Sequence, residues 1–343
     1  MPKNLAFFAD GTWDEACNNS NVQRLYAAAA NVPGVQLTTY SSGVGTAGNL
    51  LDSIIGGAFG AGLFGKIKDG YTAIASQYVP GDSIFIFGFS RGAYTARSLA
   101  GMIAICGLPT TNQNDPKLLG QCVDTAFEAY RNAAQRPMLL DTLNESYRMD
   151  NAKIQLLGVW DTVGSLGIPA IFGAIDVIQY GFLDTNLHPD VLNAVQAVSI
   201  DEQRLQFQPA LWTGGTAPGQ TLTQVWFSGV HCDVGGGYAQ DLGGLALSNI
   251  TLHWMASHAQ ACGLQFRAGA FPPAPQPGDA LATLHDSLTG LYRLSPHPRN
   301  IVTGSVLANS VSQRCAAGAS RYAPSNLHFV SEQLANTYSV MAV

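Results

Sequence analysis

Short apolar runs that each end at a polar or glycine residue are the feature that most constrains the fold of this chain. A continuous apolar run bounded by turn residues is typical of a strand buried on both faces of a sheet. Stretches of helical character separate the runs, so strand and helix alternate, and this predicts an α/β fold with a mainly parallel central sheet flanked by helices. The predicted strands are 5–9, 83–87, 154–160 and 224–230, and the predicted helices are 66–78, 93–105, 116–134 and 245–261.

Each predicted strand leads into a residue type that can carry chemistry. Asp10, Asp161 and His231 follow three of the strands, and the segment 88–92, Gly-Phe-Ser-Arg-Gly, follows the fourth. In an open parallel sheet, ligands bind in the crevice beyond the carboxyl ends of the strands. We therefore expect these residues to converge on one crevice.

The size and composition of the chain indicate one large domain. Of its 343 residues, 47% are hydrophobic and 12% are charged, so the core is large and the surface relies on uncharged polar side chains. We expect a single α/β domain over 1–343, with cap or lid insertions near 43–65 and 166–183. These two segments are rich in glycine or apolar residues, which fits either loop packing or a lid that contacts acyl chains.

Charge and the N-terminal sequence restrict the partners and the location of the protein. The formal net charge is -6, with Lys and Arg scattered, so nucleic acid is not an expected partner. No basic patch would draw the chain to anionic lipid, so any transient contact with a membrane or lipid surface has to be apolar. The first apolar run stops at Asp10, and this run is too short for a signal-peptide core. We expect synthesis in the cytoplasm without a cleaved signal peptide.

The segment 88–92 has the pattern of a nucleophile elbow, with Ser90 as the nucleophile. Such an elbow needs glycines two residues before and after the serine, because the sharp turn from strand to helix leaves no room for side chains there. Here an apolar strand precedes Ser90 and a helical stretch follows it. This context predicts a serine hydrolase with an α/β-hydrolase-like fold.

An attacking serine needs a histidine base and a carboxylate that orients the base. In this fold the acid and then the histidine follow the serine along the chain. Asp161 and then His231 stand at strand ends after Ser90, so we predict the triad Ser90, Asp161 and His231. One alternative stays open: Asp233 as the acid and His285 as the base, because the base of this fold usually comes from a late loop.

The turn 10–12, Asp-Gly-Thr, is expected to complete an oxyanion hole. The N–H of Arg91, one residue after the nucleophile, supplies one donor, and the N–H of Gly11 or Thr12 supplies the second. Asp10 either caps this turn or lines the site together with Phe89.

Two other classes of function are alternatives. A metal-dependent hydrolase would use His231 and Asp233, with Asp10 and Asp161 as further oxygen ligands, although this spacing matches no recognised metal motif. A lipid-binding or interaction protein would keep the fold without turnover. The serine hydrolase needs no metal and no cofactor, and we expect none.

Several blocks of the sequence together resemble the catalytic domain of type VI secretion phospholipase effectors, a family formerly classed as a domain of unknown function. The blocks follow the order of the family along the chain. They are 7–13, 40–46, 88–97, 158–163, 201–204, 226–238 and 322–327.

The resemblance implies a serine α/β-hydrolase that cleaves ester bonds of phospholipids or related lipids through an acyl-enzyme. It places the nucleophile, acid and base of the family at Ser90, Asp161 and His231, in agreement with the order of these residues along the chain. It also implies export by a secretion system that needs no signal peptide.

Overall fold

A parallel sheet of eight strands forms the centre of the computed structural model, which describes residues 2–11, 19–43, 58–163, 186–317, 322–330 and 333–343. The strand order is β12-β9-β8-β7-β6-β3-β1-β2, and every neighbouring pair is parallel, which confirms the prediction of a mainly parallel α/β sheet. The strands are β1 (Asn4–Ala9), β2 (Gln36–Ser41), β3 (Ser83–Phe89), β6 (Ile154–Trp160), β7 (Asn193–Ser199), β8 (Thr221–Phe227), β9 (Val306–Ala308) and β12 (Ser339–Met341).

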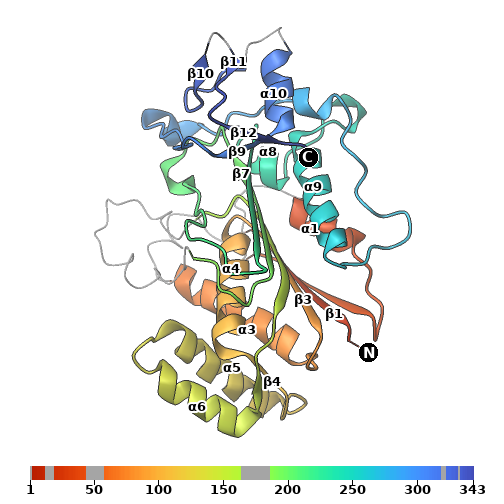
Figure 1. Cartoon of the computed structure of the whole chain (residues 1–343), viewed down its shortest axis with the longest axis vertical. Coiled ribbons are helices and arrows are strands. Elements are labelled where there is room, and N and C mark those ends of the chain that lie inside the picture. The colour runs from red at the N-terminus through yellow and green to blue at the C-terminus, as the bar shows by residue number, and fades with distance from the viewer. Residues whose placement is uncertain (1, 12–18, 44–57, 164–185, 318–321, 331–332) are drawn as a thin grey trace.

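Helices cover both faces of this sheet (Figure 1). On one face lie α3 (Ala58–Ala75), α4 (Arg91–Cys106) and α5 (Pro116–Arg131), with α6 (Arg136–Tyr147) packed on α5. On the other face lie α1 (Asn21–Ala28), α9 (Leu247–Ala261) and α10 (Asn309–Ala316). Two short antiparallel pairs flank the sheet, β4 (Leu108–Pro109) with β5 (Met149–Asp150), and β10 (Phe329–Val330) with β11 (Gln333–Leu334).

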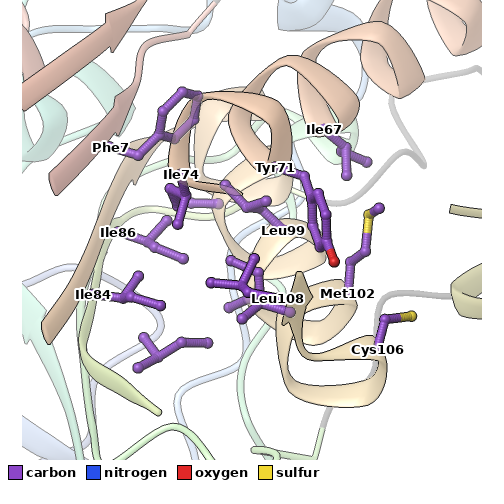
Figure 2. Close-up of a cluster of buried hydrophobic side chains, with 14 of the residues drawn as sticks. Phe7, Ile67, Tyr71, Ile74, Ile84, Ile86, Leu99, Met102, Cys106 and Leu108 are labelled. Carbon is purple, nitrogen blue, oxygen red and sulfur yellow. The ribbon is translucent and has the colours of Figure 1, made fainter. Parts of the chain in front are cut away.

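The apolar strands are buried on both faces because their side chains alternate between two cores. In β3, Ile84 and Ile86 join the core beneath α3 and α4, whereas Phe85 and Phe87 join the core beneath α1 and α9. Figure 2 shows Ile84 and Ile86 in the first core, together with Tyr71 of α3 and other apolar side chains. A continuous apolar run is therefore what a central strand of this sheet requires.

Some predicted boundaries differ from the structure. The predicted strand 224–230 is β8, but it begins and ends three residues earlier, at Thr221 and Phe227, because the chain leaves the sheet and turns at Gly229 (φ 116°) to reach His231. The helix predicted at 66–78 begins at Ala58, within a glycine-rich stretch. Leu63, on that early part, packs into the core, and this burial outweighs the low helix propensity of glycine.

The two predicted insertions fall mainly on residues outside the described part of the chain. This holds for all of 166–183 and for most of 43–65, whose last residues form the beginning of α3. Among the described residues, no helix has the length and apolar character needed to cross a membrane.

Candidate active site

Ser90 stands in a strained turn between β3 and α4. Its backbone has φ 59° and ψ −126°, a left-handed conformation that non-glycine residues rarely adopt and that a nucleophile elbow requires. The neighbouring glycines cannot be replaced without a clash: a Cβ on Gly88 would lie 2.4 Å from the carbonyl oxygen of Gly92, and one on Gly92 would lie 2.2 Å from that of Ala9. The predicted elbow geometry is therefore present.

Asp161 and His231 form a buried hydrogen-bonded pair. Asp161 directly follows β6, and His231 is the first residue of the short helix α8 (His231–Gly235), which follows β8. The distance from His231 Nδ1 to Asp161 Oδ2 is 2.5 Å, and both side chains are fully buried. With Nδ1 donating to the carboxylate, Nε2 of His231 is the nitrogen that can take a proton.

Two contacts connect this pair to the elbow. Phe89 and Trp160 are paired across β3 and β6, so Ser90 and Asp161 follow opposite residues of the same ladder. The N–H of Ser90 donates to the carbonyl of Trp160 at 3.1 Å, and the rings of Phe89 and His231 lie 4.7 Å apart between centroids. Ser90 and Asp161 thus follow neighbouring strands, while His231 follows β8, which β7 separates from β6. All three lie beyond the carboxyl ends of the strands, as expected for the crevice of a parallel sheet.

Arg299 binds the carboxylate of Asp161, and the sequence did not predict this residue. Its Nη1 donates to Asp161 Oδ1 at 2.6 Å and its Nη2 to Oδ2 at 2.9 Å, with the arginine 1% exposed. Nη1 also donates to the carbonyl and hydroxyl of Ser199, and Nη2 to the carbonyl of Phe207. No local motif marks Arg299, because its partners lie about 100 residues away along the chain.

These partners set the charge of Asp161. Burial by itself would raise the pKa of the Asp161 carboxyl, but the Arg299 cation and the hydrogen bonds from His231 and Arg299 hold that pKa below its usual range. The N–H of Ser199 donates a further bond to Oδ1 at 2.9 Å. Asp161 therefore stays ionised at neutral pH, although it is buried.

The environment of His231 keeps its imidazole neutral. Burial lowers the pKa of His231, and this outweighs the opposing effects of Asp161 and Glu202. The ring of Phe207 meets the imidazole edge-on at 5.0 Å between centroids. A neutral imidazole at neutral pH is the state that a general base requires.

An ion pair and several hydrogen bonds hold the turn 201–204 in place. Glu202 and Arg204 form an ion pair at 2.9 Å, and Glu202 also accepts from the hydroxyl of Ser287. Asp201 does not join this pair, because it accepts instead from the N–H of Gly229 and the hydroxyl of Tyr322.

The alternative acid and base, Asp233 and His285, also pair with each other. His285 Nδ1 lies 2.6 Å from Asp233 Oδ1, and the His285 ring stacks on Tyr238 at 3.8 Å. Asp233 in addition accepts from the N–H of Val230 at 3.1 Å, so it caps the start of α8. The side chain of His285 is 30% exposed, in contrast to His231, which is fully buried beside Phe89.

Asp10 has the role of a turn residue. Its Oδ1 accepts from the N–H of Gly11 at 2.8 Å, and its Oδ2 accepts from the hydroxyls of Ser20 and Tyr40 at 2.6 Å each. The Gly11 N–H therefore points at Asp10, and it would have to leave this bond to reach an oxyanion. Thr12, the other predicted donor from this turn, lies outside the described residues.

The residues proposed as metal ligands in one alternative have other partners. Asp161 binds Arg299 and His231, Asp233 binds His285, and Asp10 binds Ser20 and Tyr40. Within the described ranges no three His, Cys, Asp or Glu side chains form a group that could hold a metal ion.

Known proteins similar to this chain include one curated relative and two solved structures. An uncharacterized protein of Saccharomyces cerevisiae is 27% identical in an alignment 237 residues long that covers 62% of this chain; the chain spans 33% of the length of that relative. An uncharacterized protein from Pseudomonas aeruginosa is 20% identical, with a TM-score of 0.47 over 78% of this chain and 46% of that one. A Tle1 effector bound to the VgrG spike of the type VI secretion system is 16% identical, with a TM-score of 0.45 over 88% and 82%.

A family model matches most of the chain. The match covers residues 3–258 and carries the description "T6SS, Phospholipase effector Tle1-like, catalytic domain". It includes Ser90, Asp161 and His231, whereas His285 and Arg299 lie beyond its end. The resemblance found in the sequence is thereby confirmed, and the chain belongs to the family of Tle1-like phospholipase effector catalytic domains of the type VI secretion system.

Proposed function

We propose that this chain hydrolyses carboxylic ester bonds of phospholipids through an acyl-enzyme on Ser90, with His231 as the base and Asp161 as its orienting carboxylate. The observation that carries the proposal is the fully buried hydrogen bond of 2.5 Å between Asp161 and His231. Asp161 of this pair follows β6, the strand beside β3, and β3 leads into the strained elbow that presents Ser90. The family supplies the class of substrate.

In the first half of the reaction, His231 Nε2 takes the hydroxyl proton of Ser90 as the Ser90 oxygen attacks the ester carbonyl. The N–H of Arg91, at the N-terminus of α4, donates to the oxyanion of the tetrahedral intermediate. His231 then gives its proton to the departing alcohol, and the acyl group remains on Ser90. Asp161 stabilises the imidazolium throughout but is not itself protonated.

In the second half, water attacks the acyl group and His231 takes its proton. Collapse of this intermediate releases the fatty acid and returns the proton to Ser90. The Arg299 cation keeps Asp161 ionised in both halves, so Asp161 can stabilise the imidazolium each time that His231 takes a proton. The cycle is complete without a cofactor.

Replacement of the nucleophile tests the proposal. We expect Ser90→Ala to lower kcat for p-nitrophenyl esters at least about 10³-fold without loss of the fold, because only the attacking oxygen is removed. Ser76→Ala, directly after the end of α3, is a matched control that should behave as wild type, since the Ser76 hydroxyl donates to the nearby carbonyl of Ala73. Retained activity in Ser90→Ala would contradict the assignment.

Covalent labelling separates an enzyme from a protein that only binds lipid. A fluorophosphonate probe reacts with an activated serine, so we expect it to label wild type and the Ser76→Ala control but not Ser90→Ala. Circular dichroism and the Tm of each variant show whether the fold is kept. A folded wild-type protein that takes no label would favour the non-catalytic alternative.

The family also bears on how the protein is exported from the cell. Because its members are effectors of the type VI secretion system, we propose that this chain is exported by that system without a cleaved signal peptide. Inactivating the secretion apparatus of the host cell should abolish export and leave the intracellular amount unchanged. Export that persists in such a strain would contradict this part of the proposal.

A further inference from the structure

A small, open cavity lies directly beside the elbow. It lies where the carboxyl ends of β1 and β2 meet the beginning of α4 and one side of α3. Polar and charged residues from all four elements or the turns that follow them line it: Asp10, Ser41, Ser42, Lys66, Arg91 and Thr95. The mechanism above uses only the backbone of one of these residues, Arg91.

The two cations of this cavity come from helices that are packed firmly together. Leu63, one turn before Lys66 on α3, is buried and lines the same cavity. Ile67 and Tyr71 of α3 lie with Leu99 of α4 in one core (Figure 2). The position of Lys66 relative to the start of α4 is therefore set by the core and does not depend on a surface loop.

Asp10, the carboxylate among the described residues that line the cavity, already has its partners. Both oxygens of Asp10 accept hydrogen bonds, from the N–H of Gly11 and from the hydroxyls of Ser20 and Tyr40. Among the described residues of the lining, Lys66 and Arg91 are the cations, and the charge of Asp10 is shared by three donors. Such a site favours a single negative charge with several oxygen acceptors.

We propose that this cavity binds the phosphate of a glycerophospholipid, with the side chains of Lys66 and Arg91 as its cationic partners. This inference rests on the proposed function. A phosphodiester carries one negative charge, and the N-terminal end of α4 adds the positive end of a helix dipole of sixteen residues.

The position of the cavity fits the covalent structure of such a lipid. The phosphate and the acyl esters of a glycerophospholipid are attached to the same three-carbon glycerol. An ester held at Ser90 therefore brings the phosphate close to the elbow, and Arg91, which follows Ser90 directly, lines the cavity. A neutral lipid with the same acyl chains would gain nothing from Lys66.

A pair of substrates that differ only in the head group tests this subsite. The substrates are a diacyl phosphatidylcholine and the diacylglycerol with the same acyl chains, each in micelles of a neutral detergent. For Lys66→Met we expect kcat/KM on phosphatidylcholine to fall about tenfold, mainly through KM, with diacylglycerol unchanged, because one charge-assisted contact is lost.

Lys68→Met is the matched control on the same helix. Lys68 instead pairs with Asp124 at 2.8 Å on the side of α3 that faces α5, so its replacement should leave both substrates unaffected. A Lys66→Met variant that hydrolyses both substrates as wild type does, or that loses both equally, would overturn the inference.

A binding measurement separates this inference from the proposed function. We expect glycerophosphocholine to bind Ser90→Ala in calorimetry and to bind the Ser90→Ala, Lys66→Met double variant about tenfold more weakly. This measurement needs no turnover, so it tests the subsite even if Ser90 is not the nucleophile. If inorganic phosphate binds and glycerophosphocholine does not, the cavity binds a free anion, and the inference that it binds the phosphate of a lipid is overturned.

Discussion

Arg299 holds the carboxylate of Asp161 through both of its terminal nitrogens, from a position 138 residues further along the chain. The contact is fully buried, and the same guanidinium also donates to the carbonyls of Ser199 and Phe207. Arg299 therefore fixes both the charge and the orientation of Asp161, whose own backbone is held at φ 39°. The residue lies beyond the region that the family model matches.

Replacing Arg299 should alter the pH dependence as well as the rate. We expect Arg299→Gln to lower kcat about 10- to 100-fold, because Asp161 is held less firmly beside His231. Removal of the cation should also raise the pKa of His231, so the acid limb of kcat/KM moves to higher pH. The measurement is a pH series on a p-nitrophenyl ester.

Arg299→Lys is the control for this prediction, because it keeps the charge and loses the two-pronged contact. It should lower kcat but leave the acid limb near its wild-type position. If Arg299→Gln loses activity with no movement of the limb, Arg299 supports only the fold. The Tm of both variants should fall, since a buried carboxylate loses part of its compensation.

Removal of His231 should abolish most of the activity, whereas removal of His285 should change it little. We expect His231→Ala to lower kcat at least about 10³-fold, as for the loss of a catalytic base. His285→Ala should keep activity within about threefold, since His285 is partly exposed and paired with Asp233 rather than with Asp161. The reverse pattern would make Asp233 and His285 the acid and base.

Burial of His231 predicts activity that extends below the usual histidine range. Because burial lowers the pKa of His231, the neutral base persists below the ordinary value of about 6.5, and the acid limb of kcat/KM should lie under that pH. The Asp161 carboxyl, whose pKa is also lowered, stays ionised over the same range. A limb centred above pH 7 in wild type would contradict the neutral buried imidazole.

The same shifts predict how stability depends on pH. A group whose pKa is lower in the folded state binds protons more readily when unfolded, so the free energy of unfolding falls as pH decreases below the unfolded value. The loss begins near the ordinary pKa of each group, 6.5 for His231 and 3.8 for Asp161. Urea unfolding of wild type at pH values between 8 and 3, roughly one unit apart, measures this pH dependence.

The glycine at the beginning of α4 should tolerate no side chain. A Cβ on Gly92 would lie 2.2 Å from the carbonyl oxygen of Ala9 and 2.6 Å from that of Asp10, and backbone atoms cannot move aside as a flexible side chain would. We expect Gly92→Ala to cost about 2–4 kcal/mol of unfolding free energy and to impair activity. Chemical denaturation and ester hydrolysis measure the two effects.

Gly120 provides the matched control for the Gly92 variant. It lies exposed within α5, and a Cβ there would meet nothing within 4 Å. Gly120→Ala should therefore stabilise the protein by about 0.5–1 kcal/mol through better helix propensity. Equal losses of stability in both variants would show that the clash at Gly92 is not the cause.

The sequence alone determined the central strands and the elbow. Residues 84–87 are all apolar, and in 154–160 Gln155 is the one polar side chain. A strand buried on both faces needs such a pattern, so local composition was sufficient for both. Strand β7 was missed because Gln196, which donates to the carbonyl of Ala210, interrupts the apolar run. The start of α3 was missed because burial of Leu63 outweighs the glycines around it.

Only the tertiary structure decided how the polar groups at the strand ends pair. The order of residues along the chain allowed His231 or His285 as the base, and the fold pairs Asp161 with His231 and Asp233 with His285. Arg299 and Lys66 carry no local signal, since the residues around each come from elements distant in sequence. Apolar periodicity is a local property of the chain, whereas a charged contact across 70 or 138 residues depends on how the packed sheet brings its loops together.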